Sequence, residues 1–123
     1  MPDFTEIIAD DRESTSGIFE HLRSFSDVRL HIERLLTGDY IVDNTIIFER
    51  KAAADFAESL IDTRLFCQAR RLANQSLRGA FIIEGSASDW CKLRVLRVRR
   101  EAFQGALLTL SLVFDLPVFR SEI

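Results

Sequence analysis

The residues best suited to chemistry lie in the stretch GDYIVDNTIIFERKAAAD, which begins at Gly38. Asp39 opens this stretch, and the triplet Glu49, Arg50, Lys51 follows toward its end. Because side chains alternate along a strand, Glu49 and Lys51 point to one face and Arg50 points to the other. A carboxylate beside an ammonium, with a second carboxylate from a neighbouring strand, predicts a site for Mg²⁺, which binds through one or two carboxylates and a substrate phosphate. Such a cation would clamp a phosphodiester and lower the pKa of a bound water, so the stretch predicts phosphodiester hydrolysis.

The hairpin inside this stretch decides whether Asp39 and Glu49 can share one cation. A two-residue turn would pair Asp39 with Phe48 and place Asp39 on the face opposite Glu49. A three-residue loop, a bulge, or a frayed strand start at Asp39 would each allow a shared cation. We expect a three-residue loop over residues 43–45, in which Asn44 or Thr45 adopts the unusual backbone angle.

Hydrophobic periodicity predicts that strands and helices alternate around this hairpin. Strands are expected over residues 4–10, 28–32, 79–85 and 116–119, in addition to the hairpin. Helices are expected over residues 14–24, from residue 52 to a break at 62–63, and over 64–77 and 101–114. This order predicts an α/β sandwich with a central mixed sheet and an antiparallel hairpin.

The length of 123 residues fits one domain with a single core. No signal peptide is apparent, and the longest nearly apolar run, residues 106–114, is about half of the ~20 residues that a membrane helix needs. Cys67 and Cys91 have no zinc-site or disulfide spacing, so we expect both to pack in the interior of a protein from a reducing compartment.

The charges are divided unevenly along the chain. Residues 1–61 carry six Lys or Arg against thirteen Asp or Glu, and residues 62–123 carry ten against six. An acidic half that holds a metal and a basic half that meets phosphate would suit a nuclease, and solvated helix faces would explain the same division. The charge pattern alone favours neither interpretation.

Gly38-Asp39, then Glu49-Arg50-Lys51, then Asp55 after three residues resembles the signature of the XPF/Hef-type structure-selective nucleases. The resemblance extends to Asp-x-Arg-Glu at residues 10–13, Arg-Leu-x-x-Gln at 64–68 and the closing run GALLTLSLVFDLPVF. It implies a restriction-endonuclease-like α/β/α sandwich. It also implies a DNA endonuclease that cuts branched, flapped or forked duplexes in repair or recombination and works as a homodimer or heterodimer.

The resemblance further implies Mg²⁺ or Mn²⁺ as the cofactor and assigns the site residues. The catalytic set is Asp10, Glu13, Asp39, Glu49, Arg50, Lys51 and Asp55, and the metal set is Asp39, Glu49 and Asp10. In this scheme Asp39 and Glu49 are direct ligands, the Arg50 carbonyl is a candidate third, and Lys51 positions water or stabilises charge on the phosphate. Asp10 and Glu13 act through water or behind the direct ligands, and Asp55 has no assigned role.

The candidate DNA contacts are Arg12, Arg64, Arg70 and Arg71. Arg12 or Arg50 could instead brace the carboxylates, and Arg64 could pair with Asp55 or Glu58 across the helix break. Within residues 86–100, Trp90 could stack on an unpaired base or pack in the core. Asp11 or Ser14 could cap the first helix, and Glu84 could face the acidic cluster or only close its strand.

The second hypothesis is a non-catalytic scaffold that binds DNA or pairs with an active nuclease subunit. The intact Glu-Arg-Lys triplet favours catalysis, because such partners typically lose it. We expect one nuclease domain over residues 1–123 without a helix-hairpin-helix module. We also expect no membrane segment, a dimer contact through an exposed stripe on the helix at 103–114, and a location in the nucleoid-associated cytoplasm or the nucleus.

Overall fold

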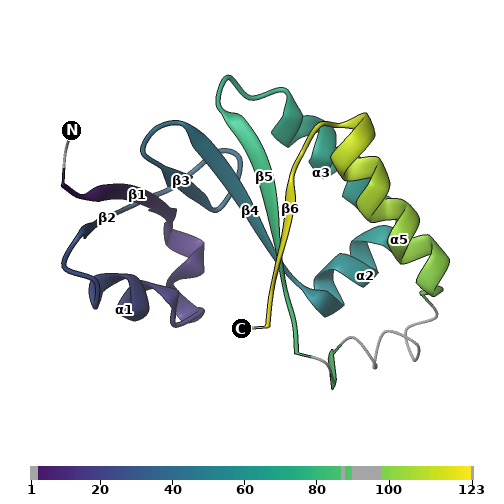
Figure 1. Cartoon of the computed structure of the whole chain (residues 1–123), viewed down its shortest axis with the longest axis horizontal. Helices are drawn as coiled ribbons and strands as arrows, with labels where there is room; N and C mark the ends of the chain where they lie inside the picture. The colour runs from purple at the N-terminus through teal and green to yellow at the C-terminus, as the bar shows by residue number, and fades with distance from the viewer. Residues whose placement is uncertain (1–2, 87, 90–97, 123) are drawn as a thin grey trace.

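The computed structural model describes residues 3–86, 88–89 and 98–122, and these form a mixed six-stranded sheet with helices on both faces (Figure 1). The sheet order is β2-β1-β3-β4-β5-β6. The strands are β1 (Thr5–Asp10), β2 (Val28–Glu33), β3 (Tyr40–Val42), β4 (Ile46–Ala52), β5 (Arg78–Glu84) and β6 (Val118–Ser121). Strands β1–β3 and β3–β4 pair antiparallel, and the other three pairs are parallel. The expected sandwich with a central mixed sheet is confirmed.

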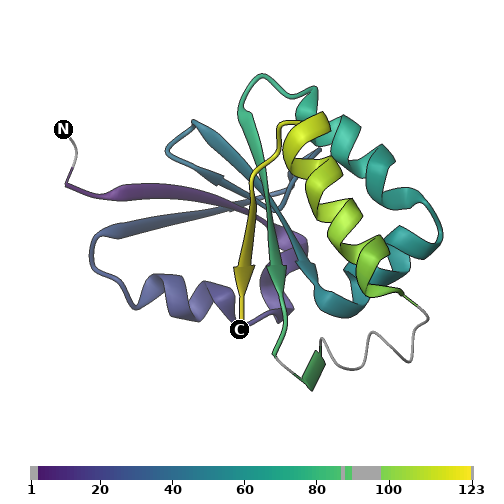
Figure 2. The same cartoon turned by 45° about the vertical axis from the view of Figure 1, so that its right-hand side comes forward.

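The helices divide between the two faces of the sheet, as Figures 1 and 2 show. A 3₁₀ turn (Asp11–Thr15) and α1 (Ile18–Arg23) lie on one side, and α2 (Ala53–Ile61), α3 (Arg64–Ala73) and α5 (Arg100–Leu108) lie on the other. A π turn (Thr109–Val113) continues α5. None of the helices in the described ranges has the length and apolar character needed to cross a membrane.

Each face of the sheet has its own hydrophobic cluster. The larger cluster joins β4, β5, α2, α3 and α5 and is centred on fully buried side chains such as Phe56, Leu65 and Phe81. The smaller one packs Phe19 of α1 against β1 and β3. In β5, Phe81 and Ile83 are fully buried in the larger cluster, and Ile82 between them is only partly buried.

The hairpin has the predicted three-residue loop. Val42 pairs with Ile46 and Tyr40 pairs with Phe48, which leaves residues 43–45 outside the ladder. Asn44 has a left-handed backbone angle (φ 53°), as expected, and Asp43 has one as well (φ 49°). Beyond this ladder the Asp39 N–H donates to the Phe48 carbonyl (2.8 Å), and Asp39 and Glu49 line one pocket.

Several helix boundaries differ from the prediction. The first helix is split because Gly17 has φ +80°, so a 3₁₀ turn precedes a short α1 that starts at residue 18. The predicted break after α2 is confirmed at Thr63 (φ 65°). Helix α3 ends at Ala73, four residues before the predicted end at residue 77, because the chain must turn before β5 begins at Arg78. Ala73 itself is exposed.

Two predictions about side-chain burial are wrong. Phe103 and Leu110 of the C-terminal helix are buried against the core, so the stripe expected to be exposed is covered within the chain. The exposed apolar residues of this segment lie on its other side, at Leu108, Leu112 and Val113. Cys67 was expected inside but is exposed on α3, and Cys91 and Trp90 lie outside the described residues.

Candidate active site

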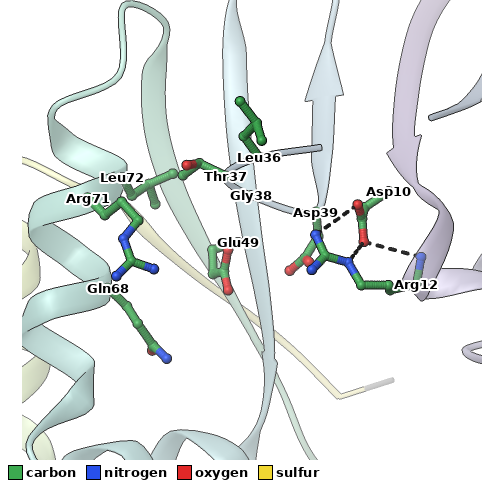
Figure 3. Close-up of a pocket in the computed structure, with 10 residues that line it drawn as sticks. All are labelled: Asp10, Arg12, Leu36, Thr37, Gly38, Asp39, Glu49, Gln68, Arg71 and Leu72. Carbon is green, nitrogen blue, oxygen red and sulfur yellow. Dashed lines mark hydrogen bonds and ion pairs between the residues drawn. The ribbon is translucent and has the colours of Figure 1, made fainter. Parts of the chain in front are cut away.

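Three carboxylates form a row across β1, β3 and β4. The Asp10 backbone N–H donates to the Asp39 carbonyl (2.8 Å), and the Asp39 N–H donates to the Phe48 carbonyl (2.8 Å). The first bond continues the β1–β3 register to Asp10 and Asp39, and the second joins Asp39 to Phe48, which already pairs with Tyr40. The side chains of Asp10, Asp39 and Glu49 all line one pocket. Figure 3 shows Asp39 and Glu49 directed toward one pocket.

Asp39 and Glu49 are carboxylates in an environment that disfavours their charge. Burial raises the pKa of Asp39 to about 6, and the charges of Glu13 and Asp10 act in the same direction. Burial together with the charge of Asp39 raises the pKa of Glu49 to about 7. Within the described ranges, neither carboxylate has an arginine or lysine within ion-pair distance. A bound cation would remove the repulsion between them.

Asp10, the third member of the row, is 1% exposed and is already fully engaged. Its oxygens accept hydrogen bonds from Arg12 Nε (2.6 Å), Arg12 Nη2 (3.1 Å), the Arg12 backbone N–H (3.2 Å) and the Leu35 backbone N–H (2.8 Å). The Arg12 guanidinium lowers the pKa of Asp10. Four donors fill the lone pairs of a carboxylate, so the structure does not support Asp10 as a direct metal ligand. Asp10, and not Asp11 or Ser14, also caps the 3₁₀ turn.

Arg50 leaves β4 on the face opposite Glu49 and braces two other acidic residues. Its Nε and Nη2 donate to the two oxygens of Glu84 at 2.9 Å each, and Nη1 lies 3.3 Å from Glu13 Oε2. The Tyr40 hydroxyl donates to the same Glu13 oxygen (3.1 Å). This network ties the 3₁₀ turn to β4 and β5. The Arg50 side chain therefore braces carboxylates, and Glu84 is its main partner.

The pocket of about 310 Å³ beside Asp39 and Glu49 is closed on its other side by α3. Its lining residues are Asp10, Arg12, Leu36, Thr37, Gly38, Asp39, Glu49, Gln68, Arg71 and Leu72 (Figure 3). Gln68 and Arg71 approach from one helix face because they are three residues apart. The Gln68 Oε1 atom is buried and has no hydrogen-bond partner in the described structure. A buried amide oxygen of this kind requires a partner from water or ligand.

Some predicted site residues lie away from this pocket. Asp55 is exposed on the first turn of α2 and does not line it. Arg64 pairs with Asp62 (2.6 Å), and not with Asp55 or Glu58 of α2, which was one of the two roles expected for it. Arg70 is exposed on α3 beside Arg71 but does not line the pocket. Lys51 is half-buried on the strand face that carries Glu49.

Sequence reasoning did not select Leu36, Thr37 or Gln68 as site residues. Gln68 is the last residue of the Arg-Leu-x-x-Gln segment, and the match of that segment to the family could have identified it as a site residue. Nothing in the sequence pattern separates Leu36 from a core leucine, because its exposure is a property of the folded loop.

Comparison with known proteins agrees with this geometry. The model of the ERCC4 domain matches residues 9–122, almost the whole chain. The chain belongs to the ERCC4 domain family. This assignment confirms the resemblance to the XPF/Hef-type nuclease domains, because the row of carboxylates and the Glu-Arg-Lys triplet both fall within the matched residues.

This ERCC4 domain is 31% identical to the 3'-flap repair endonuclease Xpf of Saccharolobus solfataricus over 116 residues, 94% of this chain and 48% of the relative. The structure of XPF from Aeropyrum pernix in complex with DNA has a TM-score of 0.82 and 34% identity, and the match covers 94% of this chain and 56% of that one. A second structure of XPF from Aeropyrum pernix has a TM-score of 0.78 and 32% identity, and the match covers 94% of this chain and 53% of that one. The chain thus spans about half the length of these relatives.

The donor set fits a hard divalent cation with few protein ligands. Among the described residues, no three His, Cys, Asp or Glu side chains converge to hold a metal ion by themselves. Mg²⁺ and ions like it bind through one or two carboxylates and complete their shell with water and substrate phosphate. The Asp39 and Glu49 pair therefore fits such an ion.

Proposed function

We propose that this chain is the catalytic domain of a divalent-metal-dependent endonuclease that hydrolyses DNA phosphodiester bonds near branches, flaps or forks. The observation that carries the proposal is that Asp39 and Glu49, two half-buried carboxylates with raised pKa values, line one pocket. The name of the Saccharolobus relative supports a flapped DNA substrate. The compartment would be the one that holds the DNA, either the nucleoid-associated cytoplasm or the nucleus.

Asp39 and Glu49 would hold Mg²⁺ or Mn²⁺, with the Arg50 carbonyl as a third candidate donor. When bound, the ion would neutralise the carboxylate pair, polarise the scissile phosphate and lower the pKa of a water. The backbone N–H of Arg50 donates to Asp39 Oδ2 (2.8 Å) and so fixes the orientation of that carboxylate. The network of Arg50 with Glu84 and Glu13 holds the strand that presents this N–H.

Lys51 supplies a positive charge on the strand face of Glu49. In the described part of the chain no carboxylate lies within ion-pair distance of Lys51, so its ammonium is available to the reaction. There it would orient the attacking water or stabilise the charge that develops on the phosphate.

Arg12 and Arg71 would flank the DNA backbone on the two sides of the carboxylate pair. The Arg12 side chain is 58% exposed although it is bonded to Asp10, which fixes its position by two hydrogen bonds. Arg71 reaches the pocket from α3. Guanidinium groups suit this role because their planar fork matches phosphate oxygens. Arg70 and Arg64, both exposed, would contact phosphates farther from the cut.

A dimer is part of the proposal, and Leu108, Leu112 and Val113 support it. Their exposed fractions are 59%, 77% and 74%, and they follow one another along α5 and the π turn. Large apolar side chains exposed close together along one segment favour a protein interface. Leu112→Glu is expected to convert a dimer into a monomer in sedimentation, and a monomeric parent chain at micromolar concentration would contradict this part.

The experiment that tests the proposal is cleavage of labelled duplex, 3'-flap, splayed-arm and fork DNA with Mg²⁺ or Mn²⁺. The parent chain would be compared with Asp39→Asn and Lys51→Met. Metal-dependent cutting that is lost in both variants would support the nuclease. DNA binding without cutting of any substrate would favour the second hypothesis, a scaffold that partners an active nuclease subunit.

A further inference from the structure

Leu36 is the most exposed large hydrophobic residue in the described structure, with a relative exposure of 100%. A single exposed leucine is ordinary on a protein surface and by itself indicates nothing. The position of this one is unusual, because it lines the pocket that holds Asp39 and Glu49. In Figure 3 it lies with Thr37 and Gly38 above these two carboxylates, between α3 and Arg12.

The loop that carries Leu36 is fastened on both sides. On one side, the Leu35 N–H donates to Asp10 (2.8 Å) and the Leu35 carbonyl accepts from Arg12 Nη2 (2.9 Å). On the other side, the Asp39 N–H donates to the Phe48 carbonyl (2.8 Å) directly after Gly38, which has φ +80°. Leu36 is therefore held in place by its neighbours, while its own side chain contacts solvent.

The other pocket residues explain what this side chain could recognise. Arg12 and Arg71 suit phosphate, and phosphate contacts position a protein on DNA without distinguishing one base step from another. Leu72, the other large apolar residue that lines the pocket, is 1% exposed and cannot reach a ligand in the same way. Leu36 is thus the group at this site that can bury apolar surface against DNA.

We propose that Leu36 is the specificity-determining residue that packs on the open face of the base pair at a DNA junction and sets the cut relative to it. In continuous duplex both faces of every base pair are stacked, so the leucine has no apolar surface to cover. At a flap or fork, the last base pair has one open face, and apolar side chains bind at unstacked steps of this kind. The inference rests on the proposed function, since it assumes that the scissile phosphate lies at Asp39 and Glu49.

The test maps the cut sites of the whole chain at nucleotide resolution on matched flap and continuous-duplex DNA. Leu36→Ala is expected to lower the preference for flap over duplex about tenfold and to spread the cut positions, since that factor corresponds to loss of part of one buried leucine contact. Leu36→Met, which keeps the apolar volume, is expected to restore both. Thermal stability should stay unchanged in all variants, because the side chain is fully exposed.

Phe25→Ala is the matched control. Phe25 is another exposed apolar residue (47%) and lies shortly before β2. It lies near the Thr5–Val28 end of the β1–β2 pair, away from the end where Asp10 pairs with Glu33. Its replacement is expected to leave cut positions and flap preference unchanged.

Three results would overturn the inference. The first is a Leu36→Ala variant that cuts at the same positions and with the same flap preference as the parent chain. The second is an equal loss of cutting on all substrates. The third is a changed oligomeric state, which would assign the leucine to a protein contact. Failure of the proposed function is distinguishable, because the parent chain would then cut nothing. In that case a 2-aminopurine base placed at the flap junction still tests whether Leu36 packs there. Its fluorescence should differ between complexes of the parent chain and of Leu36→Ala if the leucine packs on the junction. Equal fluorescence in the two complexes would contradict the inference.

Discussion

Asp39 Oδ2 accepts a hydrogen bond from the Arg50 backbone N–H at 2.8 Å, while the Arg50 side chain extends from the opposite face of β4. One residue thus orients a candidate metal ligand through its backbone and anchors its strand through its side chain. The guanidinium holds Glu84 and Glu13, and the exposed fractions of the Arg50, Glu84 and Glu13 side chains are 20%, 24% and 12%. The middle residue of the Glu-Arg-Lys triplet is therefore a positioning residue in this arrangement.

Arg50→Ala is expected to destabilise the chain by about 2–4 kcal/mol, because it leaves two half-buried carboxylates without their partner. Urea denaturation followed by circular dichroism measures the change. Arg34→Ala is the control, since its pair with Asp11 is exposed at 63% and 44% and should be worth less than about 1 kcal/mol. Equal effects of the two substitutions would contradict the bracing role.

Stability without metal is expected to fall as the pH rises from about 4 to about 7. The pKa values of Asp39 (about 6) and Glu49 (about 7) are raised in the folded state above their ordinary values of 3.8 and 4.5. The folded state therefore binds more protons than the unfolded state in this range, and the free energy of unfolding decreases with pH.

Glu49→Gln should remove most of this slope. The variant is expected to be about 1–3 kcal/mol more stable than the parent at pH 8, with a much smaller difference at pH 4. Chelator-treated protein melted across this pH range measures the effect. If the free energy of unfolding changed with pH equally in the parent and the variant, burial would not be raising the pKa of Glu49.

Mg²⁺ or Mn²⁺ is expected to raise the melting temperature of the parent chain at pH 8, because it binds the folded carboxylate pair and not the unfolded chain. Asp39→Asn should abolish this shift. Asp55→Asn serves as the control, since that carboxylate is exposed on α2 away from the pocket, and it should keep the shift. If the metal still raised the melting temperature of the Asp39→Asn variant, the metal would bind at another site.

Lys51→Met is expected to lower the single-turnover cleavage rate about 10²–10³-fold, the size of effect seen when one group that stabilises transition-state charge is removed. DNA affinity and melting temperature should change little. If Lys51→Met lowered only the affinity for DNA, the role of Lys51 would instead be to bind a DNA phosphate.

Gly38→Ala is expected to cost about 1–2 kcal/mol, because alanine resists a φ of +80°. It should also lower cleavage, since Asp39 follows directly and would shift with the backbone. Gly105→Ala is a suitable comparison, because Gly105 is helical and a Cβ there meets nothing within 4 Å. It should be neutral or stabilising.

The alternating pattern of the hairpin limited the ways in which Asp39 and Glu49 could share a face to a three-residue loop, a bulge or a frayed strand start. The three-residue loop that we predicted is present. The order of strands and helices followed from local periodicity in the same way. Where prediction failed locally, as at the split first helix, one glycine with a left-handed angle was the cause.

Other properties depended on residues that meet only in the folded chain. Asp10 accepts one of its four hydrogen bonds from the Leu35 N–H, 25 residues away, so part of its engagement depends on a long-range contact. The Arg50 side chain likewise donates hydrogen bonds to Glu13 and Glu84, which are 37 and 34 residues away in the sequence. Leu36 is apolar by sequence but exposed by the loop that holds it. The sequence thus determined which carboxylates could share a face, because strand alternation is local, and tertiary packing decided which of the neighbouring charges are held in ion pairs.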